Sequence, residues 1–142
     1  MTIPAAGSVQ IDIPFGFMVT CFGNVQSSNS QNVEMKDATG KTIFVAKGGG
    51  GGPEKPTPMN FVNGQQYFTF KVPRGTGVAA VYTLTANNMT SGKQESVLLN
   101  DMTLNVGSTV YGTLWVLMCD DIGDGTDYND CIFYVQACPP AG

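Results

Sequence analysis

The sequence predicts an all-β protein, an antiparallel β-sandwich of about nine short strands. Segments rich in Val, Ile, Thr, Tyr and Phe recur along the 142 residues, and Gly, Pro, Asn or Ser separates most of them. No stretch shows a sustained helical period with capping residues. Short strands without intervening helices are typical of two packed antiparallel sheets.

The expected strands are set by alternation and by the turn residues between them. The clearest is 66–72, where Phe68, Phe70 and Val72 share one face and more polar residues share the other. Such a strand buries one face only. The other β-type runs are 9–15, 17–23, 31–37, 42–47, 78–87, 95–106, 108–119 and 130–137.

Residues 48–58, GGGGGPEKPTP, interrupt this pattern. Glycines followed by prolines do not form the interior of a strand. We therefore expect an exposed, flexible loop inserted between strands, rather than a segment that shapes a ligand site. The chain as a whole, residues 1–142, has the length of one domain with its own core.

The composition excludes several classes of function. The chain has no histidine, which excludes serine–histidine and cysteine–histidine catalysis and histidine-containing zinc sites. Outside one acidic segment the carboxylates are scattered through solvent-like contexts, so a paired-carboxylate enzyme is not expected. These scattered residues are Asp12, Glu34, Asp37, Glu54, Glu95 and Asp101.

Charge and hydropathy bear on the partners and the location. With bases scattered singly and a pI near 4.4, nucleic acid is not an expected partner. No apolar run is long enough to span a membrane. The N-terminal MTIPAAGSVQ lacks the features of a secretory signal, so the location stays unknown, and action outside the cell or at its surface is compatible with the sequence.

The four cysteines leave the redox state open. No pair has C-x-x-C spacing, so zinc and thioredoxin-type chemistry are not expected. Cys119 and Cys131 bracket the acidic segment and would lie opposite one another if its flanks pair as a hairpin. With Cys21 and Cys138, the sequence chooses neither among the disulfide connectivities nor between disulfides and free buried thiols.

The most informative segment is 120–130, DDIGDGTDYND, which holds five of the eleven acidic residues. So many carboxylates repel one another unless a cation lies among them, and oxygen ligands on a Gly-containing loop suit calcium. The spacing does not fit an EF-hand. A metal-free Asp/Asn/Gly turn is the alternative. The candidate oxygen donors here are Asp120, Asp121, Asp124, Asp127, Asn129 and Asp130.

Two segments far apart in the sequence resemble one family. The tail, Asp124-Gly-Thr-Asp-Tyr-Asn-Asp130 with an apolar strand and a terminal Pro-Ala-Gly142, is similar to the DGTDNDYND, strand and Pro-Leu-Gly pattern of the calcium-mediated lectins. The segment Phe17-Met-Val-Thr-Cys-Phe-Gly-Asn24 resembles the FGVTAFAN loop of these small fucose- and mannose-specific proteins. The match covers about a third of the chain, and the middle agrees in strand count.

The resemblance implies a set of calcium ligands. Asp127, Asn129 and Asp130 fall on the family's D-x-N-D ligands, and Asn24 falls on the asparagine of the N-terminal loop. Gly142 corresponds to a terminal carboxylate that completes the site of a neighbouring subunit. Because the acidic loop is shortened, the remaining ligand is Asp121 if it is aligned without a gap, or Asp124 if a deletion is allowed.

The resemblance also implies how a sugar is bound. Calcium held by carboxylates keeps open positions that two vicinal sugar hydroxyls take while they donate hydrogen bonds to the same carboxylates. One calcium at least, and two by the family pattern, would serve a monosaccharide such as fucose or mannose. The implied sugar-binding residues are Asn24, Val25, Gln26, Ser27, Asp124, Asp127, Asn129 and Asp130, of which 25–27 set selectivity.

Two functions therefore follow from the sequence. The first is a calcium-dependent lectin, with glycans as partners and a homo-dimer or homo-tetramer as its assembly. The second is a structural or adhesin-type β module whose calcium only fixes the fold. The strand 130–137 has apolar residues on both faces, and a partner subunit would cover the second face.

Overall fold

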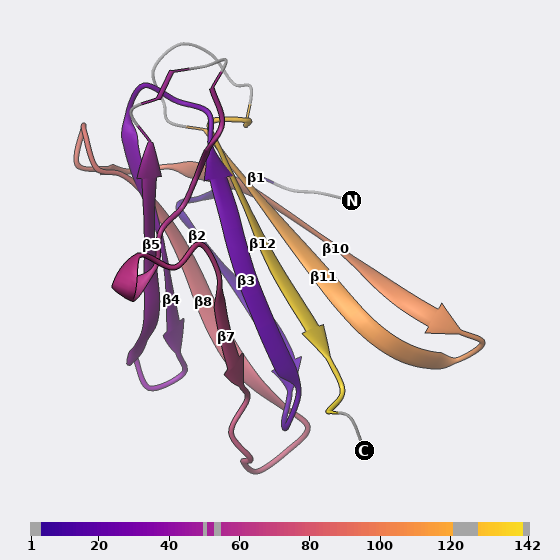
Figure 1. Ribbon diagram of the computed structural model, residues 1–142. Coiled ribbons are helices and arrows are strands. Elements are labelled where there is room, and N and C mark those ends of the chain that lie inside the picture. Colours follow the sequence, from indigo (N-terminus) through magenta and orange to yellow (C-terminus); the bar gives the residue numbers. More distant parts are fainter. Residues whose placement is uncertain (1–3, 50, 53–54, 121–127, 141–142) are drawn as a thin grey trace.

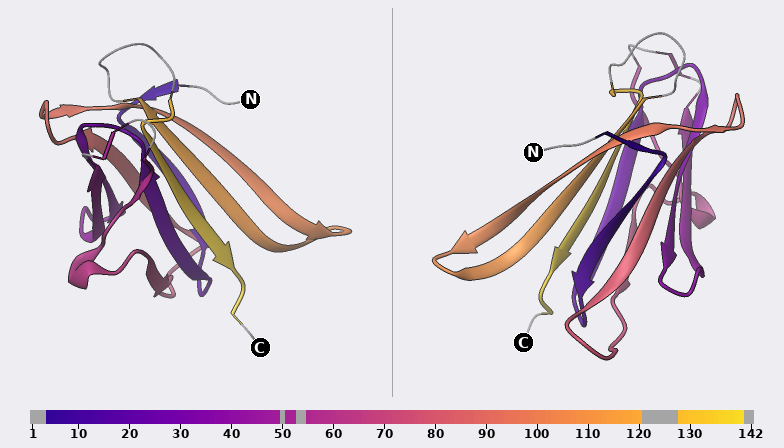
Figure 2. Two further views of the ribbon diagram at one scale, coloured as in Figure 1. Left: turned by 45° about the horizontal axis from the view of Figure 1, so that its top comes forward. Right: turned by 180° about the vertical axis from the view of Figure 1, so that it is seen from behind.

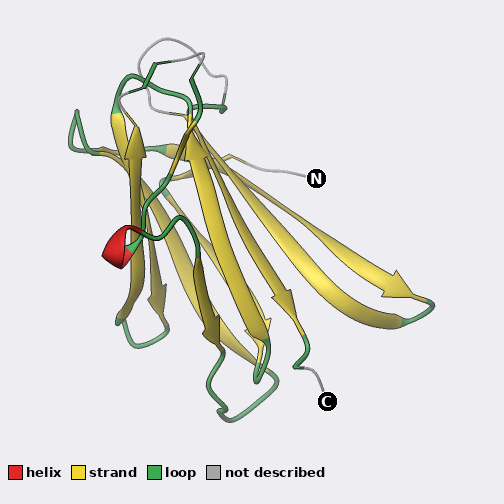
Figure 3. Ribbon diagram, in the orientation of Figure 1, coloured by secondary structure: helices red, strands yellow, loops and turns green. Residues whose placement is uncertain are grey.

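The computed structural model describes residues 4–49, 51–52, 55–120 and 128–140, which form a sandwich of two antiparallel sheets (Figures 1 and 3). The predicted all-β sandwich is confirmed. Its elements are β1 Pro4–Ala6, β2 Ser8–Pro14, β3 Met18–Val25, β4 Ser30–Asp37, β5 Thr42–Gly49, β6 Thr57–Pro58, the 3-10 turn η1 Val62–Gly64, β7 Phe68–Lys71, β8 Ala79–Asn88, β9 Lys93–Gln94, β10 Ser96–Val106, β11 Thr109–Asp120 and β12 Cys131–Cys138.

The chain crosses repeatedly between the two sheets. The seven-stranded sheet runs in the order β1-β10-β11-β12-β3-β6, and β7 also pairs with β3. The five-stranded sheet runs in the order β2-β8-β4-β5, and β9 pairs with β8. The strand β12, from the C-terminal end, therefore lies between β11 and the N-terminal β3, and Asp130, just before β12, lies next to Gln26, just after β3.

Each of the nine expected strands is present, with ends shifted by a few residues at most. The strands β1, β6 and β9 were not predicted, because they are two or three residues long and have too few side chains to show a period. The expectation for 48–58 is partly wrong. Gly48 and Gly49 end β5, and residues 57–58 form β6.

Gly48 and Gly49 of β5 lie where a side chain would come too close to neighbouring atoms. Gly49 has φ +120, and a Cβ at this position would collide with the backbone oxygen of Asn29. A Cβ on Gly48 would approach Met59 Cα and Val25 Cγ2, both at 3.3 Å. Absent side chains thus let β5 lie against the turn after β3.

The core lies between the sheets and is built by strict alternation along the strands. In β12 the residues Cys131, Phe133, Val135 and Ala137 are buried, and their neighbours are not. The ring of Phe44 lies 5.3 Å from that of Phe68 and 5.6 Å from that of Phe133. Such aromatic pairs contribute roughly 0.5–1.5 kcal/mol beyond the burial of their area.

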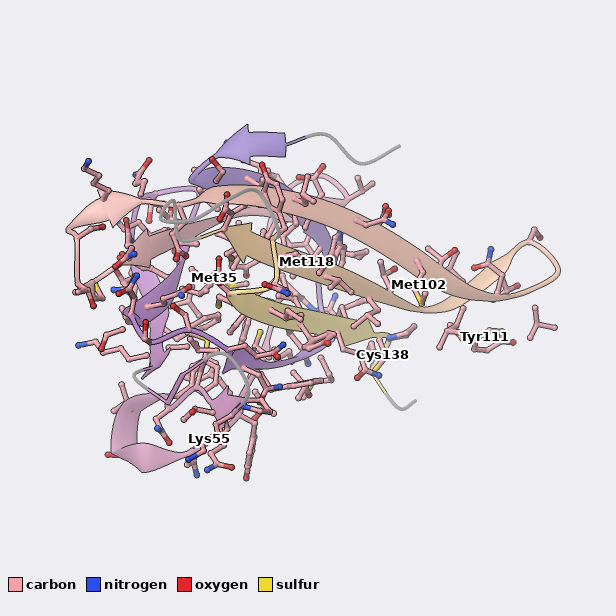
Figure 4. The ribbon with its side chains drawn as sticks, turned by 90° about the horizontal axis from the view of Figure 1, so that it is seen from above. Met35, Lys55, Met102, Tyr111, Met118 and Cys138 are labelled. Carbon is pink, nitrogen blue, oxygen red and sulfur yellow. The ribbon has the colours of Figure 1, made fainter. Side chains whose placement is uncertain are left out.

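The hairpin of β10 and β11 extends beyond the sandwich as a two-stranded arm (Figures 1 and 2). We define the arm as residues 100–111, all of which are exposed. Viewed from above, Met102 and Tyr111 lie out along the arm, whereas Met118 lies back at the sandwich (Figure 4). Within the described residues, no helix is long and apolar enough to cross a membrane.

Candidate functional site

The two segments singled out in the sequence meet at one end of the larger sheet. In the pairing of β12 with β3, Asn24 lies opposite Ile132 and Val25 lies opposite Cys131. Just beyond the strands, the Gln26 N–H donates a 2.8 Å hydrogen bond to the backbone carbonyl of Asp130. Residues more than 100 positions apart in the sequence are therefore side by side.

The backbone of Asp130 makes hydrogen bonds through both its N–H and its carbonyl. Its N–H donates to the carbonyl of Cys119 at 3.1 Å, while its own carbonyl accepts from Gln26. The side chain of Asp130 is 8% exposed, whereas Asn129 beside it is exposed. Tyr128 has φ 52, in the left-handed region that non-glycine residues seldom adopt, and the chain bends there as it enters β12.

The other predicted ligands differ in how they are placed. Asn24 lies near the end of β3, paired on its other side with Pro58 of β6, and is half-buried. The structure thus brings Asn24, Asn129 and Asp130 to one end of the sandwich. The remaining predicted residues lie outside the described ones: Asp121, Asp124, Asp127 and Gly142.

The predicted selectivity segment 25–27 runs from the last residue of β3 into the bend that leads to β4. Val25 is buried in the core. Ser27 is nearly buried, and its Oγ accepts a 3.0 Å hydrogen bond from the Asn29 N–H. Gln26 is the most accessible of the three. The Ser27 carbonyl also accepts from the Gly52 N–H at 3.4 Å, which ties this turn to the glycine-rich segment.

Two further acidic residues, neither of them a ligand by the family resemblance, are buried at this end. The expectation that Glu95 lies in a solvent-like context is wrong, because it is 1% exposed. Asp120, which the alignment left without a role, is 6% exposed and pairs with Ser96 across β10 and β11. No motif surrounds Glu95, and only the fold carries the start of β10 to the end of β11.

The pKa of the Cys119 thiol is affected by two buried carboxylates, Glu95 and Asp130. Its pKa is raised well above the usual range by its hydrogen bond with Cys131, by burial, and by the negative charges of Glu95 and Asp130. Two carboxylates thus lie near one thiol at the inner edge of the site. Carboxylates with so little exposure depend on hydrogen bonds or a cation to remain charged.

The donor atoms suit a hard cation. Asn24, Asp120, Asn129 and Asp130 offer amide and carboxylate oxygens, the ligands that calcium prefers. Within the described residues, no group of three or more His, Cys, Asp or Glu side chains forms a ready metal cluster. A calcium site at this end would therefore need the acidic residues of 121–127 as well.

Solved structures of bacterial lectins share this fold. The C-terminal domain of the BC2L-C lectin from Burkholderia cenocepacia is 16% identical, with a TM-score of 0.63 over 99% of this chain and 100% of that one. A high-affinity mannose-binding lectin from Ralstonia solanacearum is 16% identical, with a TM-score of 0.57 over 96% and 97%. The CV2L lectin from Chromobacterium violaceum, in complex with α-methyl-fucoside, is 23% identical, with a TM-score of 0.55 over 97% and 99%.

The sequence itself identifies the family. No curated protein sequence matches the chain. Residues 11–138, however, match the family described as fucose-binding lectin II (PA-IIL), and this range includes both β3 and the acidic segment. The chain is therefore a carbohydrate-binding lectin rather than an enzyme, and it belongs to the fucose-binding lectin II (PA-IIL) family.

Proposed function

We propose that this lectin binds its sugar through calcium held where the 120–130 segment meets β3. The observation that carries the proposal is the hydrogen bond from Gln26 to Asp130, because it joins the two segments that the family resemblance selects. One calcium at least, and two by the family pattern, would be held there. The proposed ligands are Asn24, Asp121, Asp124, Asp127, Asn129, Asp130 and Gly142.

Backbone hydrogen bonds and strand pairing hold the described part of the site in place. Asp130 is fixed by two backbone hydrogen bonds, and Asn24 belongs to a strand paired on both sides. Bound calcium would supply open coordination positions in which two vicinal sugar hydroxyls replace water. Ligands fixed in advance lower the entropy cost of binding both ion and sugar.

We propose fucose or mannose as the sugar. A mannose-binding lectin and a lectin crystallised with a fucoside share the fold, and the family is described by fucose binding. Because Val25 is buried and Ser27 nearly so, Gln26 is the side chain of the selectivity segment with most freedom to contact a sugar. The proposed sugar contacts remain Asn24, Val25, Gln26, Ser27, Asp124, Asp127, Asn129 and Asp130.

A glycan array tests this proposal. The protein is applied in buffer with calcium and, in parallel, with a chelator, and then again after calcium is restored. We expect binding to fucosides or mannosides that the chelator removes and calcium restores. Binding that persists in chelator would contradict the calcium mechanism while leaving the lectin function intact. Calcium binding without any sugar signal would favour a purely structural ion.

We also propose that residues 1–142 form one domain that assembles with further copies of itself. On the outer face of the larger sheet, Phe22 stacks on Tyr134 with ring centroids 4.8 Å apart. A groove of about 360 Å³ continues this surface, lined mostly by apolar side chains: Leu98, Asn100, Asp101, Met102, Leu114, Val116 and Met118.

The outer face and the arm together expose more apolar surface than a single copy covers. Along the arm, Met102, Leu104, Val106 and Tyr111 are each more than half exposed. Large contiguous apolar patches on a folded protein mark interfaces, and a dimer buries such a surface on both copies at once. We therefore propose a homo-dimer or homo-tetramer in which this face is covered.

A further inference from the structure

The four cysteines differ in whether another cysteine lies close enough to form a disulfide bond. Cys119 of β11 lies directly opposite Cys131 of β12, and their thiols are hydrogen bonded. Residues opposite one another in an antiparallel pair have Cα atoms about 4.5–5.5 Å apart, within the range that a disulfide spans. The geometry therefore permits a bond between this pair with little movement of the backbone.

The other two cysteines are too far away to compete. Cys21 lies opposite Val135, four residues along β12 from Cys131, which is roughly 13 Å at the rise of a strand. Cys138 is exposed at the far end of β12, opposite Met18. It is seven residues from Cys131, on the opposite face of the sheet.

We propose that Cys119 and Cys131 are a disulfide-forming pair that closes the base of the 120–130 segment. Both cysteines are buried, in a row of side chains that runs Val97, Cys119, Cys131, Val25 across four neighbouring strands. The side chain of Met59 also contacts the pair, because the Met59 Sδ lies 3.7 Å from the Cys131 Sγ. The pair is shielded from solvent once the sandwich has formed.

The oxidant in this reaction is a low-molecular-weight disulfide such as oxidised glutathione. One cysteine thiolate attacks it and releases one glutathione thiol, and the second cysteine attacks the mixed disulfide and releases the other. Two electrons pass from the two cysteines to the glutathione disulfide, and the two cysteine protons end on the released thiols. Because both thiols are buried, the exchange takes place during folding or when these strand ends open.

The bond would act on the proposed calcium site, and this part of the inference depends on the proposed function. The Cys119 carbonyl accepts a hydrogen bond from the Asp130 N–H, and Cys131 is the next residue after Asp130. A disulfide here fixes the two strand ends from which the acidic segment leaves. With the two strand ends held together before the ion binds, we expect the affinity for calcium to rise severalfold in the oxidised protein.

The experiment uses the full chain carrying Cys138→Ala, which removes the exposed thiol. The protein is refolded with oxidised glutathione or with excess reductant. Each sample is digested, under denaturing and non-reducing conditions, by a protease that cleaves before aspartate. That digest separates three fragments, 12–36 with Cys21, 101–119 with Cys119, and 130–142 with Cys131.

We expect fragments 101–119 and 130–142 to be joined only in the oxidised sample, with the mass of two hydrogens lost. In chelator, we expect the oxidised sample to melt higher by several degrees, about 5 °C or more for a loop of this length. Cys119→Ala abolishes both effects, and Cys21→Ala leaves the joined fragments unchanged. If Cys119→Ala fails to fold, the comparison of oxidised and reduced protein is sufficient to test the proposed pair.

Different results would contradict different parts of the proposal. Recovery of both fragments singly from the oxidised sample, or a link to fragment 12–36, overturns the proposed pair. A joined pair with the same calcium affinity as the reduced protein, measured by calorimetry with calcium chloride, overturns its link to the site. A joined pair in a chain that binds no calcium in either state would leave the disulfide standing and would reject the proposed function instead.

Discussion

The backbone amide of Gln26 donates a 2.8 Å hydrogen bond to the carbonyl of Asp130, and this contact joins the turn after β3 to the segment before β12. Neither residue contributes its side chain to the bond, so it tolerates changes of sequence at both positions. It also sets the distance between the proposed selectivity turn and the acidic segment.

Calcium should stabilise the fold and a chelator should lower the melting temperature. A ligand that binds only the native state adds about 2.7 kcal/mol at a concentration one hundred times its Kd. Differential scanning fluorimetry with calcium, with magnesium and with chelator measures this effect. Magnesium serves as the control because it demands a smaller, more regular oxygen shell. A melting curve indifferent to calcium and chelator would reject the metal site.

Asp127→Ala and Asp130→Ala should each abolish sugar binding while the chain remains folded in excess calcium. Both carboxylates are proposed calcium ligands, so either change removes negative charge that the ion requires. Asp120→Ala should be milder. Asp12→Ala, at an exposed residue of β2 in the smaller sheet, is the matched control and should bind like the unaltered chain. Binding to immobilised fucose or mannose measures the effect, and a signal retained by Asp130→Ala would count against the ligand set.

Gly49→Ala should destabilise the fold by about 1–3 kcal/mol and weaken sugar binding. The substitution places a Cβ against the Asn29 oxygen at φ +120, and the turn 26–30 must shift to relieve it. Gly40→Ala is the control, since its φ is +87 but nothing lies within 4 Å of the added Cβ. Urea unfolding separates the two variants. Equal losses of stability would mean that the backbone conformation alone, and not the contact with the turn, determines the cost of the substitution.

Val116→Glu should shift the assembly towards monomers. Val116 lies opposite both Asn100 and Tyr134 on the outer face, so a carboxylate there would be buried without a partner in the proposed interface. Val78→Glu, at a residue that is 87% exposed in a loop, is the control. Light scattering reports the mass of each. A monomeric unaltered chain that still binds sugar would show that no partner is needed to complete the site.

Removal of Ala141 and Gly142 should weaken sugar affinity if the terminal carboxylate completes a neighbouring subunit's site. The shortened chain should keep its melting temperature in chelator, because the deletion leaves β12 intact. Titration with a fucoside measures the loss. Unchanged affinity in an oligomeric protein would remove Gly142 from the ligand set.

The sequence alone determined the elements of this fold and the segments of its site. Alternation and turn residues mark nine strands because the side chains of a strand point to opposite faces with a period of two. The DYND string and the Val19-Thr-Cys-Phe-Gly-Asn24 stretch carry the family resemblance because each is a run of consecutive residues that can be matched without knowledge of the fold. Very short strands such as β6 carry no such period and were missed.

Only the tertiary structure decided which distant residues meet. Glu95 lies in no motif, yet the pairing of β10 with β11 buries it beside Cys119, because register is fixed by the whole sheet. In the same way, four cysteines left three connectivities open until the register placed Cys119 opposite Cys131 and kept Cys21 away. The spacing of residues along a chain does not specify which strands become neighbours. That is decided by burial and by strand pairing in the folded sheet.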